Sequence, residues 1–406
     1  MSTDVATPSD TDLENFRAEA RAWLKENFPP SLKGQAMLAM MEVKTAHAEL
    51  NKWRKAIGAK GWSAPMWPKQ YGGGGLSVAQ SRVLSDEMRK AGAFNPMGFG
   101  MGITMIGPTI LDYGTEEQKK THIPRIVKGE VQWCVGYSEP NAGSDLASLQ
   151  TKAVDKGDHW VINGQKTWTS GAQHSDWCGM LVRTDPKAKK HEGISFMLVD
   201  MHQKGIETRP IRLIAGASPF CETFITDAVA PKDALLGSLN VGWTVGKRLL
   251  QHERASQTGG GGGRVSAPIS LADLARKYVG VDAKGRIADE ELRNRINANM
   301  MAAKAHELTL QRAAAEAKGN QNPGHAMSIL KNSMTDVAQT RAELTLEIMG
   351  TQGLGWDGAG FTAEELEAVR GWLSGKAMSI YGGSFEIQNN IISKRILGLP
   401  DLTQSD

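Results

Sequence analysis

The stretch HWVINGQKTWTSGA, residues 159–172, decides how the middle of the chain folds. It places Asn163-Gly164 between two β-prone runs, and an Asn-Gly pair in that setting is a strong hairpin signal. Further short β-prone runs follow, with turn residues between them, around residues 179–183, 194–200, 206–214 and 223–228. The pattern predicts a small antiparallel β-domain or barrel, with a hairpin turn at Asn163-Gly164.

Helical patterns flank this β-prone region on both sides. Upstream, an apolar stripe begins behind a predicted capping box of Thr11 and Glu14, and further helices are expected over residues 46–58, 77–91 and 116–128. Downstream, two stripes predict antiparallel helices that share a bundle core: Leu292, Ile296, Met300, Ala303 and Leu310, and then Leu330, Met334, Val337, Leu344 and Ile348. The expected fold class is α+β, mainly α. We expect an N-terminal helical domain over residues 1–130, a middle antiparallel β-domain over 131–240 and a C-terminal helical bundle over 241–406.

Composition excludes several classes of protein. The chain has 406 residues, too many for one ordinary domain, and its 40% hydrophobic residues supply enough apolar material for a core. A formal net charge of +3 gives no basic field for nucleic acid. Cys134, Cys178 and Cys221 form no CxxC pair, so reduced buried thiols are expected rather than a metal site or a disulfide.

Targeting signals are absent from the beginning of the sequence. The first residues, MSTDVATPSDTDLENF, are acidic and lack both an apolar signal core and an Arg-rich transit pattern, so a cytoplasmic protein is expected. The long uncharged run over residues 91–111 contains Pro96, Pro108 and several glycines, which favours a buried helix with its loop over a membrane span.

Three segments are rich in residues suited to binding. YSEPNAGSD, residues 137–145, is a turn whose backbone amides can hold a flavin edge or a pyrophosphate, although a plain capped turn also fits. In NGQKTWTSGA, residues 163–172, Trp168 offers a flat wall beside two hydroxyls, and core packing is the alternative. In MSIYGGSFEIQNNIISKRILGLP, residues 378–400, a glycine-containing break opens onto a helix N-terminus, which is a ready site for an anion or a carbonyl.

These segments, in this order and behind IGPTILDYGTEEQKKTHIPRIVKGE (residues 106–130), closely resemble the acyl-CoA dehydrogenases. The resemblance extends from Asp12 to Leu399 and is strongest to the bacterial branch that contains the large subunit of pimeloyl-CoA dehydrogenase. It implies a helical domain, a β-domain and a four-helix domain, in the order already expected. It also implies FAD as cofactor, an acyl-CoA substrate of fatty-acid β-oxidation, an electron-transfer flavoprotein as acceptor, and a homotetramer built as a dimer of dimers.

The resemblance also assigns residues to the cofactor. It implies flavin and pyrophosphate contacts at Val135, Tyr137, Ser138, Gly143 and Ser144, and contacts with the dimethylbenzene side and N5 at Trp168 and Ser170. Ser384 and Glu386 match positions that touch the adenosine half, and Glu347 matches a position that reaches the FAD of a neighbouring subunit. The family's Arg-x-x-Phe-Gly motif is not recognisable in residues 269–285, so one diphosphate contact lacks a counterpart.

The catalytic base is expected on a helix. Dehydrogenation between Cα and Cβ of a thioester needs a carboxylate to take the α-proton. Many family members place it in the loop after the tyrosine, where this chain has Gly382; another branch supplies it from a helix, where LLQHERAS places Glu253. The backbone N–H of Gly382 would then bond the thioester oxygen together with a flavin hydroxyl. The competing interpretations are a surface Glu253 paired with Arg248 or Arg254, and Glu386 as the base.

Two other functions remain open from the sequence. A flavin oxidase or monooxygenase would keep the fold and react with oxygen. A non-catalytic acyl-CoA-binding subunit of a heteromer would lack either the base or the flavin. The acyl group is not determined, and the glycine tract at residues 259–263 suggests unusual space or flexibility near its pocket.

Overall fold

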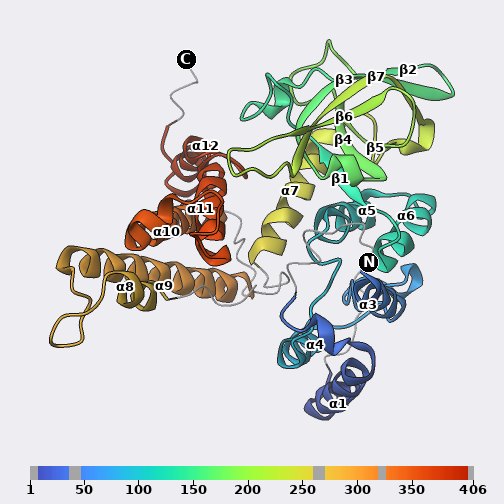
Figure 1. The fold of residues 1–406 in the computed structure, drawn as a ribbon. Coiled ribbons are helices and arrows are strands. Elements are labelled where there is room, and N and C mark those ends of the chain that lie inside the picture. Colours follow the sequence, from blue (N-terminus) through green and yellow to red (C-terminus); the bar gives the residue numbers. More distant parts are fainter. Residues whose placement is uncertain (1–7, 36–46, 259–269, 319–325, 401–406) are drawn as a thin grey trace. The chain divides into compact units, whose positions relative to one another are not determined.

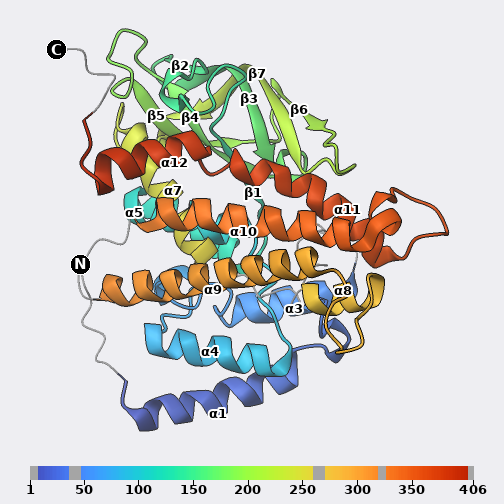
Figure 2. The ribbon, with the colours of Figure 1, turned by 90° about the vertical axis from the view of Figure 1, so that its left-hand side faces the viewer.

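The computed structural model describes residues 8–35, 47–258, 270–318 and 326–400. Contacts divide the chain into two compact units. The first comprises Met1–Ile211 and Pro219–Ser266, and the second comprises Arg212–Ser218 and Ala267–Asp406. Figures 1 and 2 show the elements of both units.

The first unit begins with helices, as the sequence predicts. They are α1 (Asp10–Asn27), α3 (Ala48–Ala59), α4 (Val78–Ala91), the π-helical turn η3 (Gly102–Ile106), α5 (Gly107–Tyr113) and α6 (Glu116–Lys128). The helices expected over residues 46–58, 77–91 and 116–128 are therefore confirmed. Short 3-10 turns, η1 (Pro30–Leu32) and η2 (Lys69–Tyr71), connect some of them.

The predicted N-terminal capping box of Thr11 and Glu14 is wrong by two residues. The helix begins at Asp10, and the cap is Ser9, whose hydroxyl accepts from the Asp12 N–H while the Asp12 carboxylate accepts from the Ser9 N–H. Ser9 has the extended backbone that a capping residue needs, which places Thr11 inside the first turn.

A seven-stranded sheet forms the middle of this unit. Its strands are β1 (Trp133–Gly136), β2 (Lys152–Asp155), β3 (His159–Ser170), β4 (Trp177–Arg183), β5 (Ile194–Asp200), β6 (Ile206–Ile211) and β7 (Phe220–Pro231). The order is β1-β4-β2-β3-β7-β6, with β5 paired to β4. Most pairs are antiparallel, but β1 runs parallel to β4, and β2 also meets β4 in parallel.

The hairpin predicted at Asn163-Gly164 is wrong, because β3 runs straight through these residues. The turn between β2 and β3 lies instead over residues 156–158, where Gly157 has φ +96°. Gly164 sits at a register shift against β7, and a Cβ there would lie 2.4 Å from the Thr151 hydroxyl. The glycine therefore permits a close approach of Thr151 to β3 rather than a turn.

The chain returns to helices after the sheet. Helix α7 (Gly242–Thr258) packs on β4, β5, α5 and η3 and groups with the first unit. In the second unit lie α8 (Leu271–Tyr278), α9 (Glu290–Lys318), α10 (Ala326–Met349), α11 (Ala363–Gly375) and α12 (Phe385–Ile391). Figure 2 shows α9 and α10 side by side.

The two predicted stripes of the second unit are buried only in part. Leu292, Ile296, Leu344 and Ile348 share one core cluster with residues of α8. Met300 and Met334 are 54% and 36% exposed, so α9 and α10 do not bury the full length of their stripes within this unit. No helix in the described ranges is long and apolar enough to cross a membrane.

A buried carboxylate joins α1 to α4 in the first unit. Glu87 on α4 is 2% exposed and bonds Arg21 and Arg17 of α1 as well as Lys90 on its own helix. The hydrogen bonds from Arg21 and Lys90 hold the pKa of Glu87 at about 2, below its ordinary 4.5. A depressed folded-state pKa means that this carboxylate stabilises the protein above pH 4.5 and loses that effect as pH falls toward 2.

We therefore expect Glu87→Gln to lower the free energy of unfolding at pH 7 and to match the wild-type protein near pH 2. Urea unfolding at pH 7, 5 and 3 measures the difference, because other titrating groups are common to both proteins. Glu26→Gln, at an exposed position of α1, is the matched control and should follow the wild-type curve. If Glu87→Gln lowered the free energy of unfolding by the same amount at every pH, the role assigned to this carboxylate would be contradicted.

Candidate active site

Two of the segments singled out in the sequence meet near the end of β3. The first is the binding loop, residues 137–149, which follows β1; the second is the end of β3. The Thr167 N–H donates to the Ser138 carbonyl at 2.8 Å, which fixes one segment directly on the other. Because both belong to the first unit, their relative position is determined within one packed body.

A buried ion pair fastens this junction. The Lys166 ammonium, fully buried on β3, lies 2.8 Å from the Glu139 carboxylate and donates to the Tyr137 carbonyl at 3.2 Å. The N–H groups of Gln150 and Thr151 also donate to Glu139, at 2.6 and 2.9 Å. Each charge is therefore surrounded by hydrogen-bond partners, as a buried pair requires.

The pKa shifts of this pair have opposing causes. Burial raises the pKa of Glu139, but the Lys166 charge outweighs burial, and the pKa lies below its ordinary value. Burial lowers the pKa of Lys166, and the Glu139 charge opposes that shift. The net shift of the Lys166 pKa is downward, and each charge favours the ionised form of the other.

Arg183, on β4, holds the far end of the binding loop. Its guanidinium donates to the carbonyls of Ala147 and Leu149 at 2.6 and 3.4 Å. An ion pair between Lys190 and Asp145 adds a second connection on the same side. The loop is thus attached at both ends, by Lys166 near its beginning and by Arg183 near its end.

Trp168 stands out from the sheet. It has φ +57°, lies within a register shift between β3 and β7, and is 55% exposed. Its ring packs edge-on against Phe220 with centroids 6.0 Å apart. A β-bulge re-aims the side chain that it carries, and here it turns a flat indole outward beside the binding loop.

Small polar groups surround this indole. Ser138 and Ser170 are half-buried, and Gly143 and Ser144 are exposed. A Cβ on Gly143 would meet nothing within 4 Å, and within the described ranges the hydroxyls of the three serines make no hydrogen bond to protein. A flat apolar wall with open hydroxyl and amide groups fits a planar heteroaromatic ligand that carries oxygen-rich substituents.

Tyr137 and Val135 occupy different environments from those serines. Tyr137 is buried, and its hydroxyl donates to the Gly246 carbonyl on α7 at 3.1 Å. Burial raises the pKa of Tyr137, and the negative charge of Glu253 raises it further. Val135, on β1, is half-buried. Tyr137 therefore links the binding loop to α7, the helix that carries Glu253.

Helix α7 is anchored close to Glu253. Asp112, near the end of α5, accepts from Arg248 at 2.7 Å and from His252 at 2.9 Å. Burial raises the pKa of Asp112, but these two partners outweigh it and lower the pKa overall. Glu253 itself is half-buried. Glu253 thus belongs to the same unit as the binding loop and lies on the helix to which Tyr137 is hydrogen-bonded.

The other predicted residues lie in the second unit. Gly382 has φ +66°, its carbonyl accepts from the Gln388 side chain at 2.7 Å, and a Cβ there would meet nothing within 4 Å. In the described part of the chain its N–H makes no backbone hydrogen bond, so that group is available to a ligand oxygen.

Three further residues of that unit have structural partners. Ser384 caps α12 by accepting from the Ile387 N–H. A hydrogen bond from Ser384 lowers the pKa of Glu386, and the charge of Lys331 lowers it further. Glu347 bonds Arg295 through both oxygens, at 2.6 and 2.7 Å.

Sequence reasoning missed Lys166, Glu139 and Arg183. A usable signal was present for the first two, because each is a charge inside a segment already marked as special. Lys166 also falls on the same face of the predicted strand as Trp160 and Ile162, where an apolar residue would be expected. Arg183 carried no such signal. Its role depends on hydrogen bonds to carbonyl groups more than 30 residues away in the chain.

Comparison with known proteins identifies the family. A family model of the acyl-CoA dehydrogenase N-terminal domain matches residues 10–130, the middle-domain model matches 134–228 and the C-terminal-domain model matches 240–397. The chain belongs to the acyl-CoA dehydrogenase family. It is an acyl-CoA dehydrogenase, an oxidoreductase, with the helical, β and helical order that the sequence predicts.

Named relatives and solved structures agree with this. The chain is 36% identical over 397 residues to acyl-CoA dehydrogenase IpdE1 of Mycobacterium tuberculosis, covering 96% of this chain and 98% of that protein. The structure of the Tcur3481–Tcur3483 steroid acyl-CoA dehydrogenase has a TM-score of 0.76 at 29% identity, covering 98% of this chain and 100% of that one. The ChsE4–ChsE5 complex from Mycobacterium tuberculosis gives 0.72 at 30% identity, covering 98% and 100%.

We expect Lys166→Met to destabilise the dehydrogenase strongly, because it leaves the Glu139 carboxylate buried without its cation. Removing one partner of a buried pair typically costs about 3–5 kcal/mol. Chemical denaturation measures this loss. Lys152→Met, at an exposed lysine of neighbouring β2, is the control and should change little.

The pH dependence separates charge from packing. In the wild-type protein, the lowered pKa of Glu139 makes its stabilising effect decline as pH falls below the ordinary 4.5. In the variant, Glu139 is buried without the Lys166 charge, which favours its neutral form. Protonation at low pH therefore removes the cost of burying the Glu139 charge. The difference in the free energy of unfolding between the wild-type protein and Lys166→Met should become smaller as pH falls. A difference that does not change with pH would mean that only side-chain packing was lost.

Proposed function

We propose that this acyl-CoA dehydrogenase binds FAD against Trp168 and the binding loop and dehydrogenates an acyl-CoA thioester to the trans-2-enoyl-CoA. The single observation that carries the proposal is the junction of the loop with β3, where the bulge turns Trp168 outward among open hydroxyl and amide groups. Val135, Tyr137, Ser138, Gly143, Ser144, Trp168 and Ser170 would hold the flavin and pyrophosphate. FAD, when bound, supplies the acceptor for the hydride that leaves Cβ.

Glu253 is proposed as the base that takes the α-proton. Its half-buried position on α7, the helix that Tyr137 bonds to the binding loop, supports this role. The N–H of Gly382 would donate to the thioester oxygen and stabilise the negative charge that develops there. The glycine leaves that side of the substrate without a side chain.

The remaining cofactor contacts belong to the second unit. Ser384 and Glu386 are proposed to touch the adenosine half of FAD, and Glu347 the FAD of a neighbouring subunit. The bidentate Arg295 pair holds the Glu347 carboxylate in one orientation, which supports a fixed contact.

Partners follow from the family resemblance. We propose an electron-transfer flavoprotein as electron acceptor, a homotetramer arranged as a dimer of dimers, and an acyl-CoA substrate of fatty-acid metabolism. The resemblance to the large subunit of pimeloyl-CoA dehydrogenase supports a place in the same branch. Mass in solution tests the assembly, and rapid hydrogen peroxide release without any mediator would favour the oxidase alternative.

A heteromeric enzyme is the second candidate. The observation that favours it is the likeness to the ChsE4–ChsE5 complex, which is built from two different chains. The chain on its own would then be colourless or inactive with acyl-CoA. A purified chain that is yellow and bleaches with a thioester would exclude this candidate.

Trp168→Ala should weaken FAD retention by about tenfold, because it removes the flat surface on which the ring packs. Flavin absorbance per protein after dialysis, and titration of the apoprotein with FAD, measure the effect. Trp168→Phe should retain most of the affinity, and Trp356→Ala, at a tryptophan 39% exposed in the second unit, is the control. Unchanged retention in Trp168→Ala would place the flavin elsewhere.

Glu253→Gln should keep FAD and acyl-CoA binding while slowing flavin reduction about 10²-fold or more, the usual scale for a positioned base. Single-turnover bleaching measures this rate, and Glu117→Gln, at an exposed position of α6, is the control. Adding Gly382→Glu should restore activity only in part, because φ +66° strains any residue with a side chain. Full activity in Glu253→Gln would refute the assignment.

A further inference from the structure

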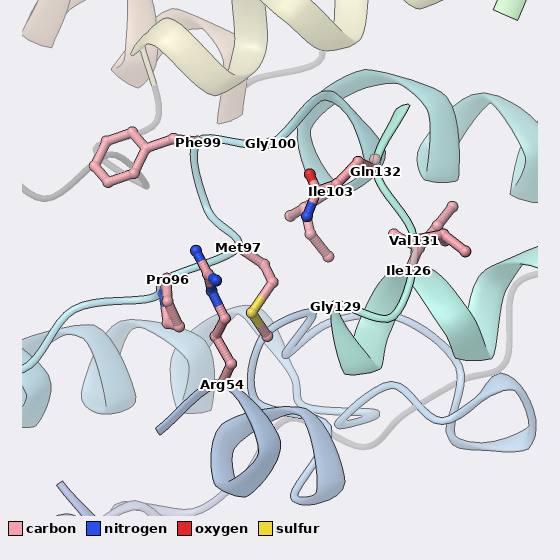
Figure 3. A pocket seen from close by; sticks show the side chains of 11 residues that line it. Arg54, Pro96, Met97, Phe99, Gly100, Ile103, Ile126, Gly129, Val131 and Gln132 are labelled. Atoms are coloured by element: carbon pink, nitrogen blue, oxygen red, sulfur yellow. The ribbon is translucent and has the colours of Figure 1, made fainter. Parts of the chain in front are cut away.

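Buried charged atoms without a hydrogen-bond partner are rare among the described residues. Figure 3 shows a cavity of about 80 Å³ between α3 and the residues that precede β1, and its lining is largely apolar. The one charged side chain in that lining, Arg54, already interacts with another group of the protein. In the described ranges, the charged atom that is buried and has no hydrogen-bond partner is the Lys331 ammonium, on α10 of the second unit.

Lys331 lies against an aromatic ring of α12. Its ammonium is 5.1 Å from the centre of the Phe385 ring, which gives a cation–π contact. Burial lowers the pKa of Lys331, and the nearby charge of Glu386 opposes that shift without forming a hydrogen bond to the ammonium. An ammonium has three N–H donors, and burying them unpaired is costly. This cation is therefore suited to an acceptor that the described residues do not supply.

A second buried polar atom without a partner lies where α10 packs on α12. It is Oδ1 of Asn332, the residue after Lys331, and the amide nitrogen of the same side chain donates to Asn389 Oδ1 at 2.9 Å. Among the described residues, this junction therefore leaves one donor group and one acceptor unpaired. A nucleotide offers the complement of both, because its phosphate oxygens accept hydrogen bonds and its ribose hydroxyls donate them.

Lys331 is close to the two residues proposed for the adenosine half of FAD. Phe385, which it contacts, stands between Ser384 and Glu386 in the chain. A hydrogen bond from Ser384 lowers the pKa of Glu386, and the charge of Lys331 lowers it further. The Lys331 side chain as a whole is half-buried, and its four-carbon stem is flexible, so the ammonium can turn toward a ligand beside Glu386.

We propose that Lys331 binds a phosphate of a nucleotide held at this junction, and that the nucleotide is the adenosine half of FAD. The inference rests on the proposed function above, which places Ser384 and Glu386 on the adenosine, and it adds the cation that the phosphate needs. A phosphate beside the Glu386 carboxylate alone would be repelled, and the Lys331 ammonium offsets that repulsion. CoA also carries adenosine phosphates, so the two sources must be distinguished by measurement.

Binding of FAD to the apoprotein at low salt is the first measurement. Lys331→Met removes the charge and keeps much of the side-chain volume, and it should raise the Kd of FAD about 10- to 100-fold, the scale of one hydrogen bond to a charged group. ADP, which has the adenosine half without the flavin, should lose affinity in proportion. FMN, which has the flavin without the adenosine, should bind as before.

Matched variants test the charge itself. Lys331→Arg should retain part of the FAD affinity, and Lys304→Met, at an exposed lysine of α9, is the control and should bind FAD like the wild-type protein. Added salt screens charges, so it should reduce the difference in Kd between the wild-type protein and Lys331→Met. An unchanged Kd of FAD in Lys331→Met would overturn the proposal.

Stability of the apoprotein separates binding from structure. An unpaired buried ammonium costs free energy when no ligand is bound, so Lys331→Met should leave the free energy of unfolding of the apoprotein unchanged or higher. Urea unfolding of the apoprotein measures this. A destabilised variant that loses affinity for FAD, ADP and FMN alike would assign Lys331 a structural role and overturn the proposal.

The source of the phosphate is decided by CoA. Calorimetry with CoA and the FAD-loaded enzyme should give the same Kd for the wild-type protein and for Lys331→Met. If the Kd of CoA rises in the variant while that of FAD is unchanged, the phosphate belongs to CoA and the assignment to FAD is wrong. If the wild-type protein binds no FAD at all, the proposed function itself fails, and that result is distinct because it does not depend on the variant.

Discussion

The buried ion pair between Lys166 and Glu139 is the interaction on which the candidate site depends. A buried ammonium is costly unless acceptors surround it, and here Glu139 and the Tyr137 carbonyl accept from Lys166. The N–H groups of Gln150 and Thr151 donate to Glu139 and complete the environment of the carboxylate. Because Glu139 lies in the binding loop, satisfying the lysine also fixes the loop. Stability and site geometry are therefore coupled through one contact.

The strained residue beside this pair shows how the coupling serves binding. Trp168 holds a positive φ within a bulge, an arrangement that costs energy and persists only where its surroundings are rigid. Lys166, two residues earlier, anchors the strand immediately before the bulge. The backbone strain at Trp168 is consistent with a binding function. An indole that points outward adds nothing to core packing, but it offers a flat surface to a cofactor.

The helix that carries the proposed base belongs to the same packed body. Tyr137 connects the binding loop to α7, Asp112 anchors α7 to α5, and η3 packs on both α7 and β1. The role proposed for Gly382 depends on its backbone, because the residue has a positive φ and no side chain.

Sequence alone determined the order of helical and β segments, the helices around residues 46–128 and the motifs that resemble the family, because periodicity and turn residues are local properties. The capping box predicted from the sequence lies two residues after the real cap, Ser9. The sequence also predicted a turn at Gly164, where the glycine instead leaves room for Thr151, which approaches β3 from outside the strand. Lys166, Glu139 and Arg183 acquire their roles only from neighbours brought together by folding. Burial, which decides what a charge must pair with, is a property of the tertiary structure.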